Sequence, residues 1–481
     1  AWPHPINGDY TRSDYWYSTI IGDDDIADVA LGRFSVWTPE QLTTVINKTF
    51  SFERYPDAED WFITRNDLVS CSQFEDGYHA CKIESIVPIL TPHGFQYYDD
   101  YGGWASNATV TAHINDSGIE KGVSLVNYRG HGIIKAWAHD SYGWNTYHEQ
   151  FHNNQIYQLT NFVDAHNAWL PIVFEIACAC GRAGVSITNP ADTTGHSECW
   201  FRWNSGGGVA ALGATRPTAT NPNHKFDTEL YRIPFGQGPI MPVTQELGWV
   251  INTAKIKVFE QYGFNNAYAK ATARANHLMG DPEIDIYTDW NGYIYATHLT
   301  RTTDEPQYFV VTVYNEQMSP LSGALVCLYQ ESGLHISGNS NASGQVSFWI
   351  TPNAEWLYVT VTKHDYGPYE GTCKVVAGLE GPQAQKGSYV YDFAFNSARY
   401  NPEMHSVNVS YQLSEKTYVE ITIFDATGRL VNTIEKGYRD SGINQNSWNC
   451  YDNCNRRLGS GIYFIRLKAA RDEALKKIVI F

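Results

Sequence analysis

The chain has 481 residues, of which 43% are hydrophobic and 18% are charged, so it can form apolar cores and does not have the composition of a disordered protein. The net charge of 34 − 51 = −17 disfavours nucleic acid and anionic membranes as its main partners. No apolar run approaches the roughly 20 residues of a membrane span, and Ala1-Trp2-Pro3 is not a signal peptide. We therefore expect a soluble protein of about three domains, whose export signal, if it has one, has been removed or lies outside this chain.

The first block, residues 1–288, alternates helix and strand patterns. Thr38 and Pro39 suit the N-cap and the first position of a helix, and Gln41 completes a capping box. A longer helix is predicted around residues 247–258 by apolar residues at helical spacing. Short, almost wholly apolar strands are predicted at residues 124–126, 172–176 and 209–212. Such strands are typical of a parallel sheet covered on both faces, so this block is predicted to be an α/β domain.

The rest of the chain changes to period-two alternation with turn signals between the runs. Residues 289–383 are predicted to form an immunoglobulin-like β-sandwich. Its strands are expected at residues 309–314, 324–329, 345–350 and 356–362. A polar linker is predicted near residues 381–388, and residues 384–481 are predicted to form a second all-β sandwich, also immunoglobulin-like.

Two reactive side chains follow apolar strands in the first block. His131 stands between glycines in VSLVNYRGHG, and Cys178 directly follows PIVFEIA. Their separation, 178 − 131 = 47 residues, is close to the roughly 50 between histidine and cysteine in caspase-like enzymes. Adjacent parallel strands would present a thiolate beside an imidazole, which is what a cysteine peptidase requires. Gly132 would leave room for a substrate carbonyl, and its N–H is a plausible oxyanion donor together with that of Cys178.

The runs NYRGHG, FEIAC, GGGVAALGATR, LMGDPEIDIY and GDDDIADVALGRFSV resemble the gingipain-type cysteine peptidases. The resemblance covers about residues 5–288 and implies a caspase-like α/β fold, endopeptidase activity and export from a bacterium. The last block resembles the small C-terminal sandwich domains that exported bacterial proteins carry for secretion or attachment, through VEITIFDATGRLV and GSGIYFIRL. The protein is therefore expected to be secreted or attached to the cell surface.

The resemblance also implies further site residues. It places the nucleophile directly after Ile-Ala, which selects Cys178 over Cys180. Asp67, in the run TRND, occupies the place of the acid that orients the histidine. Asp76 matches the residue that pairs with the substrate side chain in arginine-specific members, so cleavage after basic residues is expected; a solvated acidic loop is the alternative.

The nine cysteines are compatible with an exported protein. If Cys178 stays free, the other eight can pair locally as 71–81, 180–199, 327–373 and 450–454. Alternatively, several are simply buried thiols, or Cys180 bonds Cys178 and leaves the enzyme latent. Connectivity does not follow from the sequence alone.

Asp14 and the run Asp23-Asp24-Asp25 lie where family members bind calcium, so a structural calcium ion is an expectation at Asp14 and Asp24, with solvated loops as the alternative. No organic cofactor is expected. The match starts partway through the family's domain, so the N-terminal part of the sheet is expected to be missing. An N-terminal fragment that stays associated, or a second copy of the chain, is therefore an expected partner beside protein and peptide substrates.

Two classes of function remain open at this point. The first is an exported cysteine endopeptidase that uses Cys178 and His131. The second is a surface structural, filament or adhesive protein that uses a peptidase-like scaffold with two sandwiches as spacers.

Overall fold

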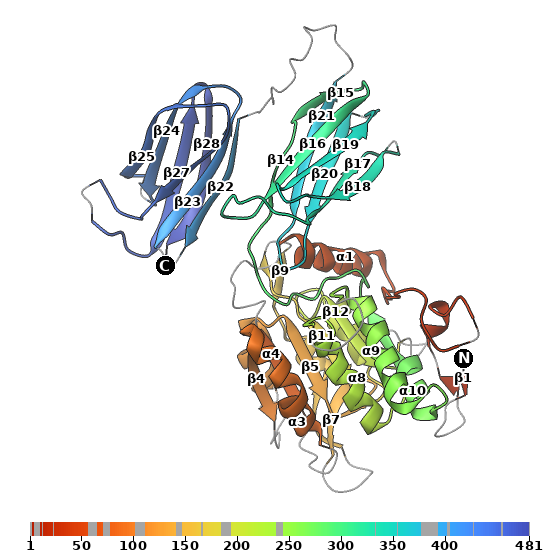
Figure 1. Ribbon diagram of the computed structural model, residues 1–481. Coiled ribbons are helices and arrows are strands. Elements are labelled where there is room, and N and C mark those ends of the chain that lie inside the picture. Colours follow the sequence, from red (N-terminus) through yellow and green to blue (C-terminus); the bar gives the residue numbers. More distant parts are fainter. Residues whose placement is uncertain are drawn as a thin grey trace. The chain divides into compact units, whose positions relative to one another are not determined.

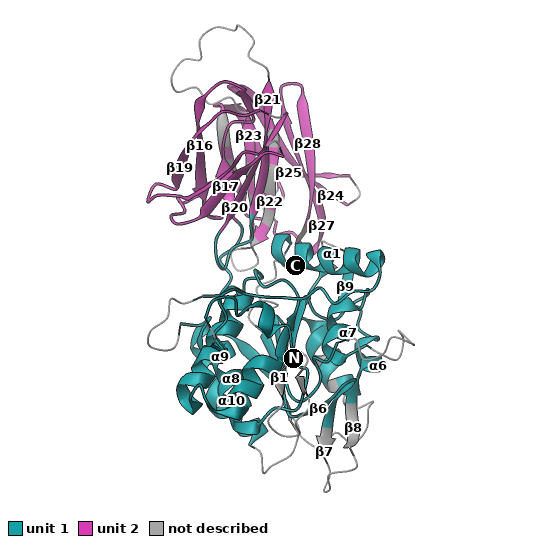
Figure 2. Ribbon diagram, turned by 90° about the vertical axis from the view of Figure 1, so that its right-hand side faces the viewer, with its two compact units in different colours: residues 1–293, 363–368 teal, residues 294–362, 369–481 magenta. Residues whose placement is uncertain are grey.

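The protein is described by a computed structural model (Figure 1). The residues that it describes are 2–3, 10–11, 13–22, 24–55, 65–70, 77–101, 111–140, 147–164, 167–183, 194–236, 244–331, 333–353, 355–376, 393–401, 405–426, 428–453 and 456–480. They form two compact units (Figure 2). Unit 1 comprises residues 1–293 and 363–368, and unit 2 comprises residues 294–362 and 369–481. The first boundary lies five residues beyond the predicted one at residue 288.

Unit 1 is built around a six-stranded sheet with the order β13-β12-β11-β5-β3-β4. Its strands are β3 (Arg65–Ser70), β4 (Gln96–Tyr101), β5 (Leu125–Arg129), β11 (Ile172–Ile176), β12 (Ala210–Ala214) and β13 (Asn276–Met279). All neighbours pair in parallel except β12 and β13. The predicted strands 124–126, 172–176 and 209–212 correspond to β5, β11 and β12. The prediction of a mostly parallel sheet in an α/β domain is confirmed.

Helices cover both faces of this sheet (Figure 2). One face packs on the apolar sides of α8 (Thr220–Arg232), α9 (Leu247–Tyr262) and α10 (Ala267–Ala275), and on α4 (Val87–Leu90); we call it the α8 face. The other face packs on η5 (Ala112–Gly118), α6 (Asn153–Ile156) and α7 (His196–Arg202); we call it the α7 face. Because side chains alternate along a strand, Phe174 faces α8 and Val173 faces α7.

The remaining helices are short, apart from α1. They are η1 (Tyr15–Tyr17), α1 (Pro39–Arg54), α3 (Tyr78–Cys81), η3 (Lys82–Ile86), η4 (Thr91–His93) and η6 (Ile119–Lys121). At α1 the Thr38 hydroxyl accepts from Gln41 N–H at 3.3 Å, as predicted. The second bond of the predicted capping box differs: the Gln41 side chain accepts from the backbone N–H of Trp37 and not from that of Thr38.

A small antiparallel sheet that the sequence did not reveal directly follows β5. It consists of β6 (His131–Ile133), β7 (Ala136–Asp140) and β8 (Tyr147–His152). Unit 1 also has two pairs of short strands, β1 (Trp2–Pro3) with β2 (Tyr10–Thr11) and β9 (Phe162–Asp164) with β10 (Asn167–Ala168).

Unit 2 begins with two sheets, of order β14-β16-β19 and β15-β21-β20-β17-β18. Their strands are β14 (Tyr295–Thr297), β15 (Arg301–Thr303), β16 (Gln307–Tyr314), β17 (Leu325–Tyr329), β18 (His335–Asn339), β19 (Gln345–Ile350), β20 (Trp356–Thr362) and β21 (Tyr369–Val376). Alternate side chains are buried, for example Phe309 and Val311 on β16 and Leu357 and Val359 on β20. The four predicted strands are present here.

The last block contains two further sheets, of order β22-β23-β26 and β25-β24-β27-β28. Their strands are β22 (Ala394–Asn401), β23 (Ser406–Leu413), β24 (Thr417–Asp425), β25 (Leu430–Arg439), β26 (Gly442–Trp448), β27 (Gly461–Ala469) and β28 (Asp472–Ile480). They share one apolar core that includes Val409, Ile421 and Ile465. The described residues between 289 and 480 contain strands and no helix, so the all-β prediction is confirmed for them, whereas the immunoglobulin-like classification stays a prediction. The predicted linker at residues 381–388 lies outside the described residues.

The predicted disulfide between Cys327 and Cys373 is wrong for this structure, because both are free thiols. In the sheet, Cys327 lies opposite Thr360 and Cys373 lies opposite Leu357, and both of these partners belong to strand β20. Residues 357 and 360 are an odd number apart, so they point to opposite faces of the sheet, and the two cysteines do too. The bond would have to cross the sheet.

Candidate active site

His131 and Cys178 lie at matching positions beyond two neighbouring parallel strands. The pairing of β5 with β11 places Arg129 beside Ile176. His131 follows Arg129 by two residues, and Cys178 follows Ile176 by two residues. Neighbouring strands are about 4.8 Å apart, so the register brings the histidine and cysteine segments side by side at the carboxyl edge of the sheet.

Gly132 packs directly on the cysteine segment. A Cβ atom built on it would lie less than 3.0 Å from Cys178 O, Cys180 Sγ and Ala177 Cβ. Only glycine fits at this position without displacing its neighbours. This contact fixes the turn that carries His131 against the turn that carries Cys178.

Exposure separates the two candidate nucleophiles. Cys178 is half-buried, and its Sγ lies 3.9 Å from Thr218 O. Cys180 is fully buried, with its Sγ 3.8 Å from Ala136 O. Burial, and secondarily the charge of Glu175, hold the pKa of the Cys180 thiol well above its ordinary value. Since the thiolate is the reactive form, this environment favours Cys178 as nucleophile.

A group of buried and half-buried side chains that the sequence did not reveal lies next to His131 on the α8 face. The rings of His131 and Tyr78 pack in a T-shaped arrangement, with centroids 5.5 Å apart and planes at 85°. The Arg129 guanidinium lies over the same tyrosine, 4.4 Å from its centroid. Arg129 Nε also donates to His224 Nδ1 at 3.2 Å. A charged residue inside a strand whose residues are all buried, as in NYRGHG, was the signal that could have revealed this group.

The prediction that Asp67 orients His131 is wrong. Asp67 lies inside β3 and pairs with Val126, which is three residues before the end of β5, whereas His131 lies beyond that end, in β6. Asp67 also points to the α7 face, where a Cβ on Gly118 would collide with its carboxylate. The β3 position level with His131 would be residue 72, which lies outside the described residues.

Two other predicted residues also lie outside the described part of the chain. Asp76, the expected specificity residue, immediately precedes the described segment that begins at Gly77. Cys71 is likewise not described, and Cys81, its expected partner, is a free thiol. The same holds at the C-terminus, where Cys450 is a free thiol and Cys454 is not described.

The predicted disulfide between Cys180 and Cys199 is also wrong for this structure. The Cys199 thiol lies against Asn153 O at 3.9 Å, whereas the Cys180 thiol lies against Ala136 O. Within the described residues, all seven cysteines are free. They fit the alternative interpretation of buried thiols better than that of a disulfide framework.

A buried polar network lies under Cys180 on the α7 face. Glu175, three residues before Cys178, bonds His196, Ser197 and the indole N–H of Trp137. Glu175, His196 and Cys180 are the one trio of possible metal ligands close together among the described residues. Both Glu175 oxygens are already used by these donors, and these hydrogen bonds tie β11 to α7 and β7.

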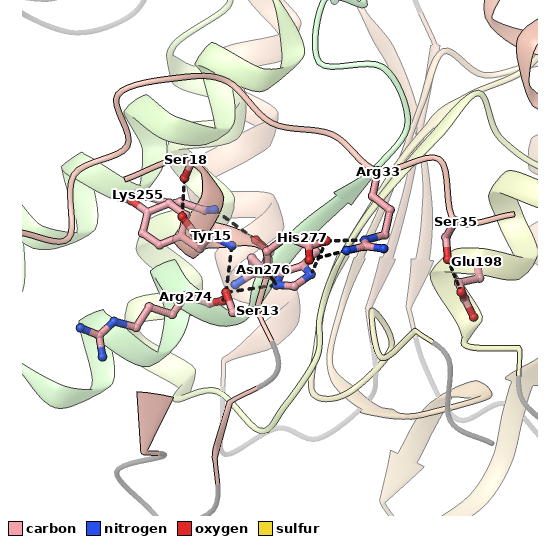
Figure 3. Close-up of polar contacts among 11 residues, drawn as sticks. Ser13, Tyr15, Ser18, Arg33, Ser35, Glu198, Lys255, Arg274, Asn276 and His277 are labelled. Atoms are coloured by element: carbon pink, nitrogen blue, oxygen red, sulfur yellow. Dashed lines mark hydrogen bonds and ion pairs between the residues drawn. The ribbon is translucent and has the colours of Figure 1, made fainter. Parts of the chain in front are cut away.

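The acidic residues proposed to bind calcium do not form one site. Arg33 donates from Nε and Nη2 to the Asp14 carboxylate, and His277 Nε2 accepts from Asp14 N at 3.0 Å. Figure 3 shows Arg33 and His277 converging on this segment. A cation at Asp14 would have to displace Arg33, so these residues do not fit a calcium site. Asp24 accepts from Ile26 N at 2.9 Å, and calcium at Asp24 stays a prediction.

A cavity of about 340 Å³ lies next to this ion pair. Arg33, Trp37, Arg182, Thr215 and His277 are among the residues that line it. Arg182 and Thr215 follow β11 and β12, so the cavity opens at the same edge of the sheet as Cys178.

Comparison with known proteins gives two family matches. The profile of peptidase family C25 matches residues 3–287, more than half of the chain. A secretion system C-terminal sorting domain matches residues 401–481, which indicates a secreted or cell-surface protein. Among the described residues, no helix combines the length and apolar character that crossing a membrane requires.

The curated relatives are gingipains. Gingipain R2 of Porphyromonas gingivalis is 30% identical over 179 residues, 35% of this chain and 21% of that protein. A gingipain R1 is also 30% identical over 179 residues, 35% of this chain and 16% of that protein. The chain thus spans about a fifth or less of the length of these relatives.

Solved structures show the same fold. The Arg specific cysteine proteinase gingipain R matches with a TM-score of 0.61 and 21% identity, over 76% of this chain and 79% of that chain. A complex of Porphyromonas gingivalis RgpB pro- and mature domains matches with a TM-score of 0.60 and 21% identity, over 76% and 81% of the two chains.

Proposed function

We propose that this chain, which belongs to peptidase family C25, is a cysteine endopeptidase in which Cys178 is the nucleophile and His131 the general base. The observation that carries the proposal is the register of β5 and β11. It sets both residues two positions beyond the paired residues Arg129 and Ile176. Both side chains are half-buried, so a substrate can reach them.

The chemistry follows from this arrangement. His131 takes the thiol proton of Cys178, and the thiolate sulfur attacks the scissile carbonyl carbon. The negative oxygen of the tetrahedral intermediate is stabilised by backbone N–H groups, for which Gly132 and Cys178 are the candidates. The intermediate collapses to a thioester as His131 protonates the leaving amine. Water, deprotonated by His131, then releases the acid and regenerates the thiol.

We propose cleavage after arginine or lysine as the specificity. Asp76 precedes α3, whose Tyr78 contacts His131, so an acidic side chain at this point is close in sequence to the site. A carboxylate selects a guanidinium through paired charge-assisted hydrogen bonds. One fold neighbour is described as an Arg specific cysteine proteinase, which supports the same choice.

We also propose an N-terminal segment of the same protein as a partner. A fold neighbour was solved as a complex of its pro- and mature domains. In the described part of this chain, β4 pairs with β3 alone and ends the sheet, and an open edge of this kind accepts a further strand. Intact-mass analysis of the secreted protein tests this. A co-purifying N-terminal fragment is expected, and a single intact chain would contradict it.

The activity is tested with a library of fluorogenic peptides. Wild type is expected to cleave after basic residues, whereas Cys178→Ala and His131→Ala are expected to lose at least 1,000-fold in kcat. Cys180→Ser is the matched control, because it alters a neighbouring cysteine that is buried and is expected to retain activity. Loss of activity in Cys180→Ser together with full activity in Cys178→Ala would show that Cys180, and not Cys178, is the nucleophile.

A further inference from the structure

We propose that Arg129 is a positioning residue that sets His131 and Cys178 against each other, an inference that rests on the proposed function. Arg129 is the last residue of β5, two positions before His131. It is 1% exposed, so it is out of reach of a substrate. A buried cation is costly unless its donors are used, and here they are used on the end of β11, which precedes Cys178, and on α8.

One guanidinium joins three segments of the site. Its Nη1 donates to Ile176 O at 2.9 Å, at the end of β11 and two residues before Cys178. Its Nη2 donates to Thr220 O at 3.0 Å, at the start of α8. Two residues earlier, just before α8, Thr218 O lies 3.9 Å from Cys178 Sγ. Arg129 therefore holds the cysteine strand and the wall of the site while belonging to the histidine strand.

The same side chain also orients the histidine ring. Arg129 lies over the face of Tyr78, and the His131 ring packs against the same tyrosine in a T-shaped arrangement. Tyr78 is nearly fully buried and also packs against His224. His224 Nδ1 accepts the hydrogen bond from Arg129 Nε, so the orientation of the guanidinium plane is fixed by this bond in addition to those to Ile176 O and Thr220 O. Arg129 thus fixes the position of Tyr78, and Tyr78 in turn packs against the His131 ring.

Lysine cannot replace this arrangement. A guanidinium offers five donors in a rigid plane and can stack on an aromatic ring while it donates in three directions. A single ammonium on a flexible stem cannot reach Ile176 O, Thr220 O and His224 Nδ1 together. The expected defect of an Arg129 variant is a misplaced dyad rather than a lost substrate contact, so it falls on kcat and not on KM.

The test uses the full chain and compares Arg129→Lys and Arg129→Ala with wild type on one cleaved peptide. A misplaced catalytic pair costs about 100-fold, so we expect kcat to fall by about that factor in both variants with KM within about twofold. Added guanidinium chloride at low millimolar concentration is expected to restore part of kcat in Arg129→Ala and none in Cys178→Ala. Unchanged kcat in folded Arg129→Ala would overturn the proposal.

Two further variants separate positioning from loss of folding. Lys82→Met is the matched control, since Lys82 is another fully buried cation that donates to a β5 carbonyl, Asn127 O at 2.7 Å. It is expected to lower the melting temperature and to leave kcat of the folded protein unchanged.

Tyr78→Leu keeps the hydrogen bonds of Arg129 and removes the aromatic ring on which the guanidinium stacks. It is expected to lower kcat, so a normal kcat in it would count against the proposal even if the Arg129 variants do not fold.

Alkylation of Cys178 by iodoacetamide distinguishes failure of this inference from failure of the proposed function. The rate reports the pairing of thiol and imidazole without any peptide turnover. We expect slower alkylation in Arg129→Ala than in wild type and Lys82→Met. Equal rates overturn the positioning role, whereas absence of peptide cleavage by wild type with a slowed rate in Arg129→Ala overturns only the proposed function.

Discussion

His131 and Cys178 are held at one level by the register of two parallel strands, because Arg129 pairs with Ile176 and each reactive residue follows by two positions. The two segments also touch through Gly132, whose missing side chain lets the Cys178 and Cys180 turn approach. The sheet thus supplies the alignment and the glycine supplies the close approach.

Gly132→Ala is therefore expected to be severe. The new methyl group would collide with Cys178 O and Cys180 Sγ, and overpacking of this kind costs about 1–3 kcal/mol. The displaced backbone also moves a proposed oxyanion donor, so kcat is expected to fall at least about 100-fold. Thermal melting and steady-state kinetics measure the two effects. Gly459→Ala is the control, since its added Cβ would meet nothing within 4 Å; equal behaviour of the two variants would contradict the role of Gly132.

Asp76→Asn is expected to reduce the preference for arginine and lysine by at least about tenfold in kcat/KM, because one paired charge-assisted contact is lost. Turnover of peptides with uncharged side chains at the cleavage point should change little. The measurement is a cleavage-site profile of wild type and variant on the same peptide library. A wild-type profile without basic residues at that point would rule out this specificity.

His364 is expected to make unit 1 less stable at alkaline pH. Its loop, residues 363–368, belongs to unit 1, and its ring lies 2.6 Å from Asp285 Oδ2 and 3.1 Å from Asp365 Oδ2. Burial lowers the pKa of His364, but the hydrogen bonds to Asp285 and Asp365 outweigh it and raise the pKa to about 9. Since the folded pKa exceeds the ordinary value, the stabilisation is complete below about pH 6.5 and is lost as pH rises through 9.

The free energy of unfolding of wild type and His364→Gln, measured by urea titration between pH 6 and 10, tests this. A rise of the pKa from 6.5 to about 9 corresponds to roughly 3.4 kcal/mol. Because the His364 ring is partly exposed to solvent, the difference is expected to be about 2 kcal/mol at pH 6 and to vanish by pH 10. Comparing the two proteins removes the contributions of other groups that titrate in this range. A difference that stays constant with pH would show that the imidazole is not held in its charged form.

Removal of residues 388–481 is expected to leave kcat and KM on a small peptide unchanged. The block has its own apolar core, formed by β22–β28, and its described residues include neither member of the proposed dyad. Because it contains the matched sorting domain, the deletion should instead reduce export or attachment, measured by fractionation of cells and medium. A large fall in kcat with the remaining unit still folded would show that the tail helps to build the active site.

Periodicity in the sequence was sufficient for the classes of the two parts of the fold and for several of their elements. The bounds of β19 and β20 match the predicted runs, because alternation of buried and exposed side chains is strong on both strands. The helix predicted around residues 247–258 corresponds to α9. The sheet formed by β6, β7 and β8 was missed, since His131–Ile133 is too short to show a period.

The site was predictable only in part. His131, Gly132 and Cys178 could be named because each follows an apolar run. The role predicted for Asp67 was wrong because the position of this residue in the sheet depends on the register of β3 with β5, which pairs Asp67 with Val126 and cannot be read from the sequence. Arg129 was missed because its role depends on Ile176 and Thr220, both far away in the chain. The Cys327–Cys373 pair failed for the same reason, since the face of a sheet to which each residue points depends on strand register.

The most direct test of the account is mapping of iodoacetamide alkylation by mass spectrometry on the native protein at neutral pH, with peptidase activity followed in the same samples. Cys178 is expected to react first, and activity should fall in proportion to its modification while Cys180 and Cys199 stay unmodified. Loss of activity that follows another cysteine, or full activity after complete modification of Cys178, would contradict the account.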